Sequence, residues 1–559
     1  MSAAEPGRRA PVSGREWAVV AAILILAFAL RTWRLDTASI DHYDEGVYAF
    51  SALGLSHAGG SLHPEQRNSP ALHSWVTSVA FRLAGASDLV MLAVNAGLGT
   101  ITVGLLWFLA RGWFGAGPAI GAAALLALND YHVALSRSGL TDPLFGLLFV
   151  LALGATMAAL ERPAVGRAVL AGVAVGLAWN TKYHGWLSVV VVTSGLVPFA
   201  IGRGWRLKEY AVAVRQLAII TAVALACYLP WMLYLIDAFG GYGAMAKYQT
   251  SFLSRNWPGN FLRQAAQQIY FDGALTRISL PAAAVAMAAV GPVWPSSARW
   301  LGAVAALGLA SVVVGGTPVT WALTAAAIPV LMAGGRLATW TLLAWGAIFL
   351  ALTPAYNPYA RLVLPFTMAT VLASAYVLAK APIWHGAPSD SKPWLAVPAA
   401  AVLLILVAVG AIAADRNDPA SRWRDTRSLP RAAAAIAARV EPGARVFVVG
   451  EAALAFHLEL AGLDALRGFE QFDVLEKDTR EQYVVTGFYT KGAPSLRDGL
   501  TRLSPRLERL GAYEFVPTDF RLLDSFRPDA ARAFLRAPDD RYALTLYRYR
   551  PGVPLPAAP

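Results

Sequence analysis

Long apolar runs without charges constrain this chain more than any other feature. They recur along roughly the first three quarters of the sequence, at lengths near the ~20 residues that an α-helix needs to cross a bilayer. The hydrophobic fraction of 57% and the mean hydropathy of +0.49 exceed what a soluble chain of 559 residues would carry. The sequence therefore predicts a multi-span α-helical membrane protein.

About thirteen segments satisfy the criteria of length and apolarity for a membrane span. They are residues 17–33, 88–110, 116–132, 142–160, 165–180, 187–202, 215–236, 278–292, 298–314, 319–334, 338–352, 360–379 and 394–413.

Basic residues predict the orientation of these spans. With the N-terminus inside, the inner loops hold a consistent excess of lysine and arginine, among them Arg111, Arg162, Arg203, Lys208 and Arg336. An odd number of spans then places the C-terminal region outside. We expect a multi-pass protein of a bacterial-type inner membrane, with a cytoplasmic N-terminus and an extracytoplasmic C-terminal domain. The net charge of +12 sits mainly in the membrane part, so it gives no reason to expect a nucleic-acid partner.

The composition of the sequence changes after residue 413, where the long apolar runs end. Residues 1–413 are predicted to form a transmembrane domain with long outer loops at 31–87 and 237–277, and residues 414–559 to form an extracytoplasmic α/β domain. In the latter, RVFVVG, EQYVVTGFY and YALTLYRY are typical of strands. The lone Cys227 excludes a disulfide framework within the chain.

An acidic pair, Asp44-Glu45, follows the first span on the predicted outer side. Carboxylates at a membrane interface are costly to dehydrate and are often functional. One can act as a general base toward a hydroxyl group while the other orients it or binds a metal. The alternative is an ordinary solvated acidic pair in a loop. From this dipeptide alone, the two interpretations are about equally supported.

Two further candidates belong to outer turns. Asp142 opens a span, where an Asp before Pro is also explained by helix capping. Lys182 is a cation at the predicted outer boundary of the membrane, where it can bind either a phosphate group or lipid headgroups. His184 adds a possible donor to the same turn, although a plain interfacial histidine is the more frequent case.

Arg361 begins a late span beside Tyr359, which suits phosphate recognition or an aromatic belt with an interfacial arginine. Glu65, in the first outer loop, is a candidate metal ligand after His63-Pro64. All of these clusters fall on the outer side of a topology that was derived from other residues. Acids and cations that can converge at a membrane face suggest a functional site.

These motifs resemble the glycosyltransferase C superfamily, specifically the family of protein O-mannosyltransferases and lipid A aminoarabinose transferases. The similar elements are Asp44-Glu45 with Tyr48, the stretch 68–75 (NSPALHSW), Asp142, the stretch Gly176–Lys182, and the turn Tyr359-x-Arg361-x-x-x-Pro365. Their order and spacing cover most of the membrane part.

The resemblance implies a polyprenyl-phosphate-linked sugar donor and an active site at the outer face. It implies Asp44 as the catalytic base, supported by Glu45 and Asp142. Lys182 and Arg361, with Tyr359 and His184, are then the residues that bind the donor phosphate. A divalent metal ion is a candidate cofactor, with Glu45, Asp142 and Glu65 as its candidate ligands.

Direct attack of an acceptor hydroxyl on such a donor predicts inversion at the anomeric carbon. The acceptor remains open among protein, lipid and glycan hydroxyls. Two other classes compete with the enzyme. A membrane transporter predicts paired inverted halves, and a non-catalytic lipid- or glycan-binding scaffold needs no converging acids and cations.

Overall fold

The computed structural model describes residues 11–551 apart from residue 59 and residues 292–297, 382–392, 416–422, 468–474, 476–479, 488–493 and 525–540. The chain divides into two compact units. The helical unit comprises Met1–Trp33, Ala96–Ser136 and Asp142–Arg422. The mixed unit comprises Arg34–Asn95, Arg137–Thr141 and Trp423–Pro559.

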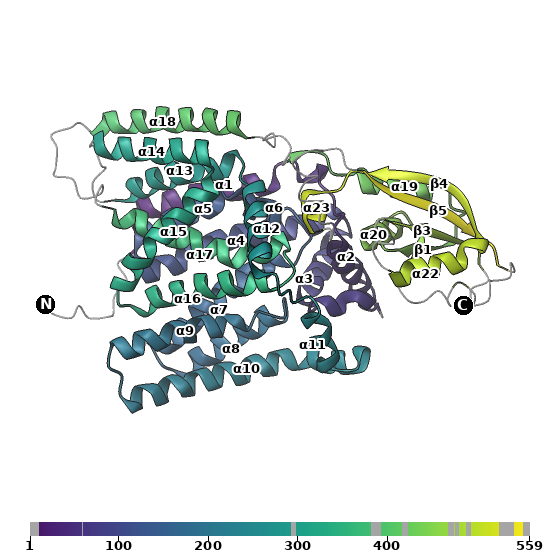
Figure 1. The fold of residues 1–559 in the computed structure, drawn as a ribbon, viewed down its shortest axis with the longest axis horizontal. Coiled ribbons are helices and arrows are strands. Elements are labelled where there is room, and N and C mark those ends of the chain that lie inside the picture. Colours follow the sequence, from purple (N-terminus) through teal and green to yellow (C-terminus); the bar gives the residue numbers. More distant parts are fainter. Residues whose placement is uncertain are drawn as a thin grey trace. The chain divides into compact units, whose positions relative to one another are not determined.

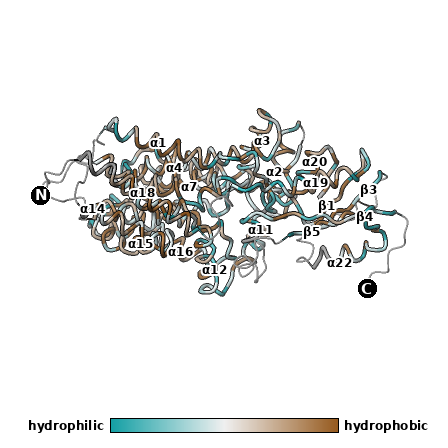
Figure 2. The backbone as a smooth tube through the Cα atoms, turned by 90° about the horizontal axis from the view of Figure 1, so that it is seen from above, coloured by the Kyte–Doolittle hydropathy of each residue, from teal (hydrophilic) through white to brown (hydrophobic). Residues whose placement is uncertain are grey.

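The helical unit consists of packed apolar helices (Figure 1). They are α1 (Gly14–Thr32), the greater part of α4 (Asp88–Phe114), α5 (Ala116–Ala127), α6 (Asp130–Ser136), α7 (Asp142–Glu161), α8 (Val165–Trp179), α9 (Leu187–Gly202), α10 (Leu207–Phe239), α11 (Tyr242–Thr250), α12 (Trp257–Tyr270), α13 (Ala274–Val290), α14 (Ala298–Val314), α15 (Gly316–Ala333), α16 (Leu337–Leu352), α17 (Leu364–Lys380) and α18 (Pro393–Ala414). Figure 2 colours most of them as hydrophobic, with more hydrophilic residues along α12.

Among the described residues, seven helices are long and apolar enough to cross a membrane, or up to nine if each of two bent pairs forms one span. Every predicted apolar segment falls on a helix or on a bent pair. Four of these helices have only 10–17 described residues, so the total of about thirteen crossings stays a prediction.

The two bent pairs, α5 with α6 and α12 with α13, turn by 63° and 80°. Each bend leaves backbone groups without helical partners. Asp130 and Thr276 provide partners reciprocally, because each backbone N–H donates to the side chain of the other residue, at 2.8 and 2.7 Å. At the end of α5, the buried Arg31 guanidinium donates to the Leu126 and Ala127 carbonyls, as a cation favours a helix C-terminus.

Two glycines allow α8 and α10 to pack closely. A Cβ atom at Gly172 would lie 2.6 Å from Val223 Cβ, and one at Gly176 would lie 2.5 Å from Cys227 Cβ. Small residues four positions apart permit such close approach of membrane helices. Gly176 in the motif Gly176–Lys182 is therefore explained by helix packing.

The mixed unit contains a five-stranded sheet in the order β2-β1-β3-β5-β4. β1 (Arg445–Val449) runs parallel to β2 (Asp464–Arg467) and β3 (Gln482–Thr486), whereas β5 (Tyr542–Tyr549) is antiparallel to β3 and β4 (Leu507–Phe515). The predicted strands RVFVVG, EQYVVTGFY and YALTLYRY contain β1, β3 and β5. The predicted fold class, a multi-helix membrane protein with a small C-terminal sheet region, is confirmed.

Alternating side chains of the sheet pack against helices on both of its faces. Val446 and Val448 of β1 contact the side of α19 (Ser428–Ala437) and α20 (Ala452–Leu460), whereas Phe447 and Val449 contact the side of α22 (Pro494–Leu503). The short helix α23 (Asp519–Asp524) follows β4.

Residues from the first predicted outer loop belong to the same unit. They form α2 (Tyr43–Ser56) and α3 (Leu72–Ala84), with short 3-10 helices η1 (Leu35–Thr37) and η2 (Pro64–Asn68). Phe50 of α2 packs on the core beneath α20. A Cβ atom at Gly46 would lie 2.0 Å from the Ala453 nitrogen, so α2 meets α20 backbone to backbone. Contacts therefore group residues 34–95 with the C-terminal region. The domain boundary predicted at residue 413 assigns these residues to the transmembrane domain instead.

Candidate functional site

Asp142 and Lys182 form an ion pair in the helical unit. Asp142 is the first residue of α7, and its Oδ1 accepts a hydrogen bond from Lys182 Nζ at 2.7 Å. Both side chains are buried, with 1% and 10% of their surfaces exposed. The second oxygen of Asp142, Oδ2, is buried and has no hydrogen-bond partner among the described residues. The pair thus places the Lys182 ammonium beside a carboxylate oxygen, Asp142 Oδ2, that can still accept a hydrogen bond.

The turn after α8 fixes the position of Lys182. The Lys182 backbone N–H donates to the Ala178 carbonyl, and the Gly185 N–H donates to the Lys182 carbonyl. A Cβ atom at Gly185 would lie 2.3 Å from the Ala178 carbonyl carbon, so the turn folds tightly onto the end of α8. A compact turn of this kind limits the range over which the ammonium group can move.

Phe145, one turn into α7, contacts two of the predicted site residues. The His184 ring meets it edge-on at 4.6 Å, and Lys182 Nζ lies 5.8 Å from the ring centroid. Burial and the nearby Lys182 ammonium lower the pKa of His184 to about 3. His184 is therefore a neutral imidazole at physiological pH, which can offer a hydrogen bond and carries no positive charge.

Arg361 belongs to the short 3-10 helix η4 (Ala360–Val363) that leads into α17. Its guanidinium stacks on Tyr359 at 5.4 Å. Three residues later, Leu364 lies 3.2 Å from the position of a Cβ atom at Gly146, one turn after Asp142. The turn with Arg361 and the ion pair therefore belong to the same end of the helical unit.

A polar stripe on α12 holds the turn that carries Arg361. Its amide side chains donate to backbone carbonyls of residues 353–360, in the pairs Asn260 to Pro354 and Tyr356, Gln264 to Thr353, Gln267 to Pro358 and Gln268 to Ala360. Sequence reasoning overlooked this stripe. Its signal was the spacing of the four amides at positions i, i+4, i+7 and i+8, which puts them on one helix face.

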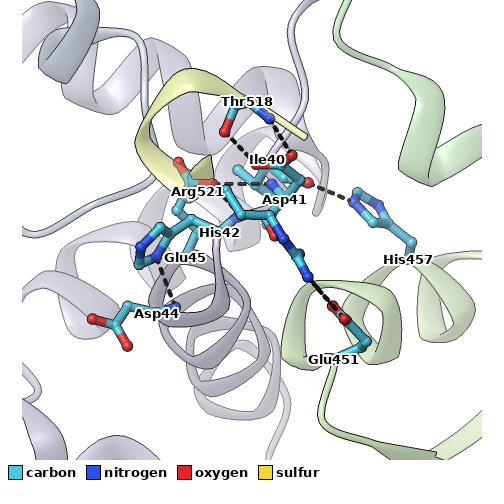
Figure 3. A network of polar contacts seen from close by, with 9 residues as sticks. All are labelled: Ile40, Asp41, His42, Asp44, Glu45, Glu451, His457, Thr518 and Arg521. Carbon is cyan, nitrogen blue, oxygen red and sulfur yellow. Dashed lines mark hydrogen bonds and ion pairs between the residues drawn. The ribbon is translucent and has the colours of Figure 1, made fainter. Parts of the chain in front are cut away.

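Asp44 and Glu45 lie in the first turn of α2, in the mixed unit. Asp44 is half-buried, and Figure 3 shows its carboxylate pointing away from the buried groups Glu451 and Arg521. Glu45 is buried and accepts three backbone hydrogen bonds, from Asp41 and His42 through Oε2 and from Gly139 through Oε1. Gly139 precedes Asp142 by three residues in the chain.

Glu45 completes a capping box with His42, whose side chain accepts from the Asp44 N–H. Burial, together with the nearby Asp41, raises the pKa of Glu45 to about 7. Both carboxylate oxygens of Glu45 are thus engaged in holding the start of α2.

Glu65, the third candidate metal ligand, lies in η2 and pairs with Arg67 at 3.6 Å. Its backbone N–H donates to His63 Nδ1, and burial lowers the pKa of His63 to about 3. The described part of the chain contains no group of three or more His, Cys, Asp or Glu side chains arranged to hold a metal ion. Since Glu45 is also engaged by three N–H donors, the three candidate ligands do not fit a metal site.

The structure therefore brings together Asp142, Lys182 and His184 around Phe145, with the turn of Arg361 and Tyr359 at the same end of the helical unit. Asp44, Glu45 and Glu65 belong to the mixed unit. The roles assigned to these residues stay predictions.

Comparisons with known proteins bear on the fold and the family. Residues 68–234 match the family described as dolichyl-phosphate-mannose-protein mannosyltransferase. No curated protein sequence matches the chain.

Solved structures of two proteins share the fold over most of the chain. ArnT from Cupriavidus metallidurans, solved with bound undecaprenyl phosphate, is 17% identical with a TM-score of 0.55, covering 95% of this chain and 98% of that one. The oligosaccharyltransferase AglB from Archaeoglobus fulgidus, solved with an inhibitory peptide and a dolichol-phosphate, is 15% identical with a TM-score of 0.51, covering 85% and 70%. Another structure of the archaeal enzyme, in complex with Zn and sulfate, has a TM-score of 0.52 at 15% identity, covering 85% and 68%. Residues 68–234 thus match a mannosyltransferase family, and the chain as a whole shares its fold with ArnT and AglB.

Proposed function

We propose that this chain moves a sugar from a polyprenyl-phosphate donor to an acceptor hydroxyl at the outer face of a bacterial-type inner membrane. The buried Asp142–Lys182 pair, beside the turn with Arg361, is the observation that carries the proposal. The relatives support it, since one was solved with undecaprenyl phosphate and another with a dolichol-phosphate and a peptide.

Lys182 and Arg361 would hold the donor phosphate. A sugar linked to a phosphate monoester leaves readily when the charge on the phosphate oxygens is neutralised, so cations matter more than a general acid. Asp142 restricts the Lys182 ammonium through the 2.7 Å hydrogen bond. Stacking on Tyr359 restricts the Arg361 guanidinium in the same way.

His184 would complete the phosphate-binding set as a neutral hydrogen-bonding group. Its pKa of about 3 means that protonation does not add a third cation in the physiological range. Its proximity to Lys182 suits one phosphate contacted by both side chains.

Asp44 would act as the base. Its carboxylate takes the proton of the acceptor hydroxyl while the acceptor oxygen bonds to the anomeric carbon. The bond from that carbon to the phosphate oxygen breaks, and polyprenyl phosphate leaves with the electron pair. This in-line displacement inverts the anomeric configuration. No step is assigned to a metal, because Glu45, Asp142 and Glu65 do not form a metal-binding group in the described residues.

The test is a donor panel. Purified protein in liposomes is incubated with polyprenyl-phosphate sugars that differ only in the sugar, and the consumption of each donor is followed with and without candidate acceptors. We expect one sugar class to be consumed and the product to have the inverted configuration. Consumption of none of them, or retention in the product, would contradict the proposal.

Matched variants locate the chemistry. Lys182→Met should weaken donor binding by on the order of tenfold or more, because it removes a buried charge that contacts phosphate. Lys247→Met is the control, since Lys247 is an exposed lysine on α11 outside the site. Equal donor affinity in the two variants would remove Lys182 from the phosphate site.

A further inference from the structure

A buried arginine near the C-terminus of the chain contacts the segment that leads into α2. Arg521 lies on α23 and is fully buried. Its Nη2 donates to both carboxylate oxygens of Glu451, at 2.8 and 2.6 Å, and its Nη1 donates to the Asp41 carbonyl. Figure 3 shows the guanidinium between these two partners. One cation therefore joins α20, through the residue before its first turn, to the approach to α2.

Two other side chains of the C-terminal region hold the same segment. The Thr518 backbone N–H donates to Asp41 Oδ2 at 2.6 Å, and its hydroxyl donates to the other carboxylate oxygen. His457 Nε2 donates to the Ile40 carbonyl at 3.0 Å. Residues far apart in the sequence thus fix both the backbone and the side chain of Asp41 (Figure 3).

From the other side, Glu45 accepts the backbone N–H groups of Asp41 and His42. The carbonyls of residues 40 and 41 are therefore held by the C-terminal region, and the amides of residues 41 and 42 by the first turn of α2. Asp44 follows Asp41 by three residues, inside the same capping turn. Any shift of the Asp41 backbone must be transmitted to the Asp44 carboxylate or absorbed within this turn.

The arginine itself is anchored in the core of the mixed unit. Its guanidinium lies 4.8 Å from the Phe515 ring and 5.1 Å from the Tyr542 ring, and both rings belong to the buried cluster around the sheet. Gly46, two residues after Asp44, meets the α20 backbone so closely that a Cβ atom would not fit. Helix α20 thus contacts the chain on both sides of Asp44, through His457 at Ile40 and through Ala453 at Gly46.

We propose that Arg521, with Glu451, is a positioning residue pair through which the C-terminal region sets the orientation of Asp44. The inference rests on the proposed role of Asp44 as the base. Arg521 does not touch the substrate in this scheme. It acts through the Asp41 carbonyl, so its loss should slow sugar transfer without weakening the binding of the donor.

The design must separate positioning from stability, because removing one member of a buried ion pair destabilises a protein. Replacing both members by apolar residues of similar size is often neutral. The key variant is therefore Glu451→Met combined with Arg521→Met, which removes the donor to the Asp41 carbonyl together with the carboxylate that pairs with it. Arg550→Met is the control, since Arg550 pairs with Glu508 in an exposed ion pair of the same unit.

Three quantities are measured on the full chain in liposomes. They are the turnover for sugar transfer with the donor found in the panel, the dissociation constant of that donor, and the hydrogen exchange of the backbone amides of residues 40–46. For the double variant we expect turnover to fall on the order of 10–100-fold, since small displacements of a catalytic group have effects of that size. Donor affinity should stay within about twofold, and exchange should rise at residues 40–46 alone. The control should match the wild type in all three.

A second variant guards against a double variant that fails to fold. Thr518→Val removes the hydroxyl bond to the Asp41 carboxylate, keeps the backbone N–H bond and leaves the ion pair intact, so it should change turnover and exchange in the same direction and to a smaller extent. Wild-type turnover and exchange in either folded variant would overturn the inference, as would faster exchange spread over the whole C-terminal region. If Asp44→Asn transfers sugar normally, the proposed function fails instead, and the exchange at residues 40–46 still reports whether Arg521 holds this segment.

Discussion

The ion pair of Asp142 and Lys182 is the clearest polar feature at the residue scale. Ionised groups with 1% and 10% exposure lose most of their hydration, and only their mutual contact and further hydrogen bonds offset that loss. A buried ion pair of this kind is therefore not expected to add much to the stability of the folded chain. In the proposed function, Asp142 instead holds the Lys182 ammonium in the position where it would contact the donor phosphate.

Separating the pair should cost more than removing it. Asp142→Asn leaves the Lys182 ammonium without its carboxylate and should lower the free energy of unfolding by about 3–5 kcal/mol. Asp142→Leu with Lys182→Met should restore most of that loss while sugar transfer stays absent. Thermal unfolding in detergent provides the comparison. A double variant that is no more stable than Asp142→Asn would contradict this account.

Glu45 should make stability depend on pH. Burial raises its pKa from 4.5 to about 7, so between these values the folded chain holds a proton that the unfolded chain releases. Stability should therefore fall as the pH rises from 4.5 to 7, by up to about 3 kcal/mol. Glu45→Gln should flatten this slope in unfolding midpoints measured across that range. An unchanged slope would show that Glu45 does not titrate there.

At the scale of elements, α12 matters because its amide side chains hold the turn that carries Arg361. Gln267 donates to the Pro358 carbonyl at 2.9 Å, three residues before Arg361. Gln267→Leu should raise the KM for the donor by on the order of tenfold, since Arg361 would lose its fixed position. Donor-dependent initial rates measure this.

Arg263→Ala is the matched control, because Arg263 is exposed on the same helix. Its kinetics should equal those of the wild type. If both variants bind donor equally well, α12 does not position Arg361.

The helices were predictable because a span must satisfy its backbone internally and present apolar side chains over a fixed length. The partner of Lys182 was not, because it comes from another helix 40 residues away. The role of Glu45 had a local signal in the spacing His42-x-x-Glu45, but a capping box normally begins with Ser or Thr. Arg521 had none, because its burial depends on the packing of α23, α20 and α2.

At the scale of the whole molecule, the predicted orientation is open to a direct test. Cys227 is the only cysteine, so Cys227→Ala provides a background without thiols. Lys208→Cys in this background probes a predicted inner loop, and Arg550→Cys probes the C-terminal region. In intact cells, a membrane-impermeant maleimide should label only the second variant, and both after permeabilisation. Labelling of Lys208→Cys in intact cells would reverse the topology.

The central claim is that a carboxylate carried by the first turn of α2 removes the proton from the acceptor. The most direct measurement is single-turnover sugar transfer by Asp44→Asn with the donor already bound, beside Asp36→Asn, which alters an exposed carboxylate of the same segment. The account predicts that both variants bind donor like the wild type and that only Asp44→Asn loses transfer, on the order of 100-fold or more. Transfer by Asp44→Asn at the wild-type rate would contradict it.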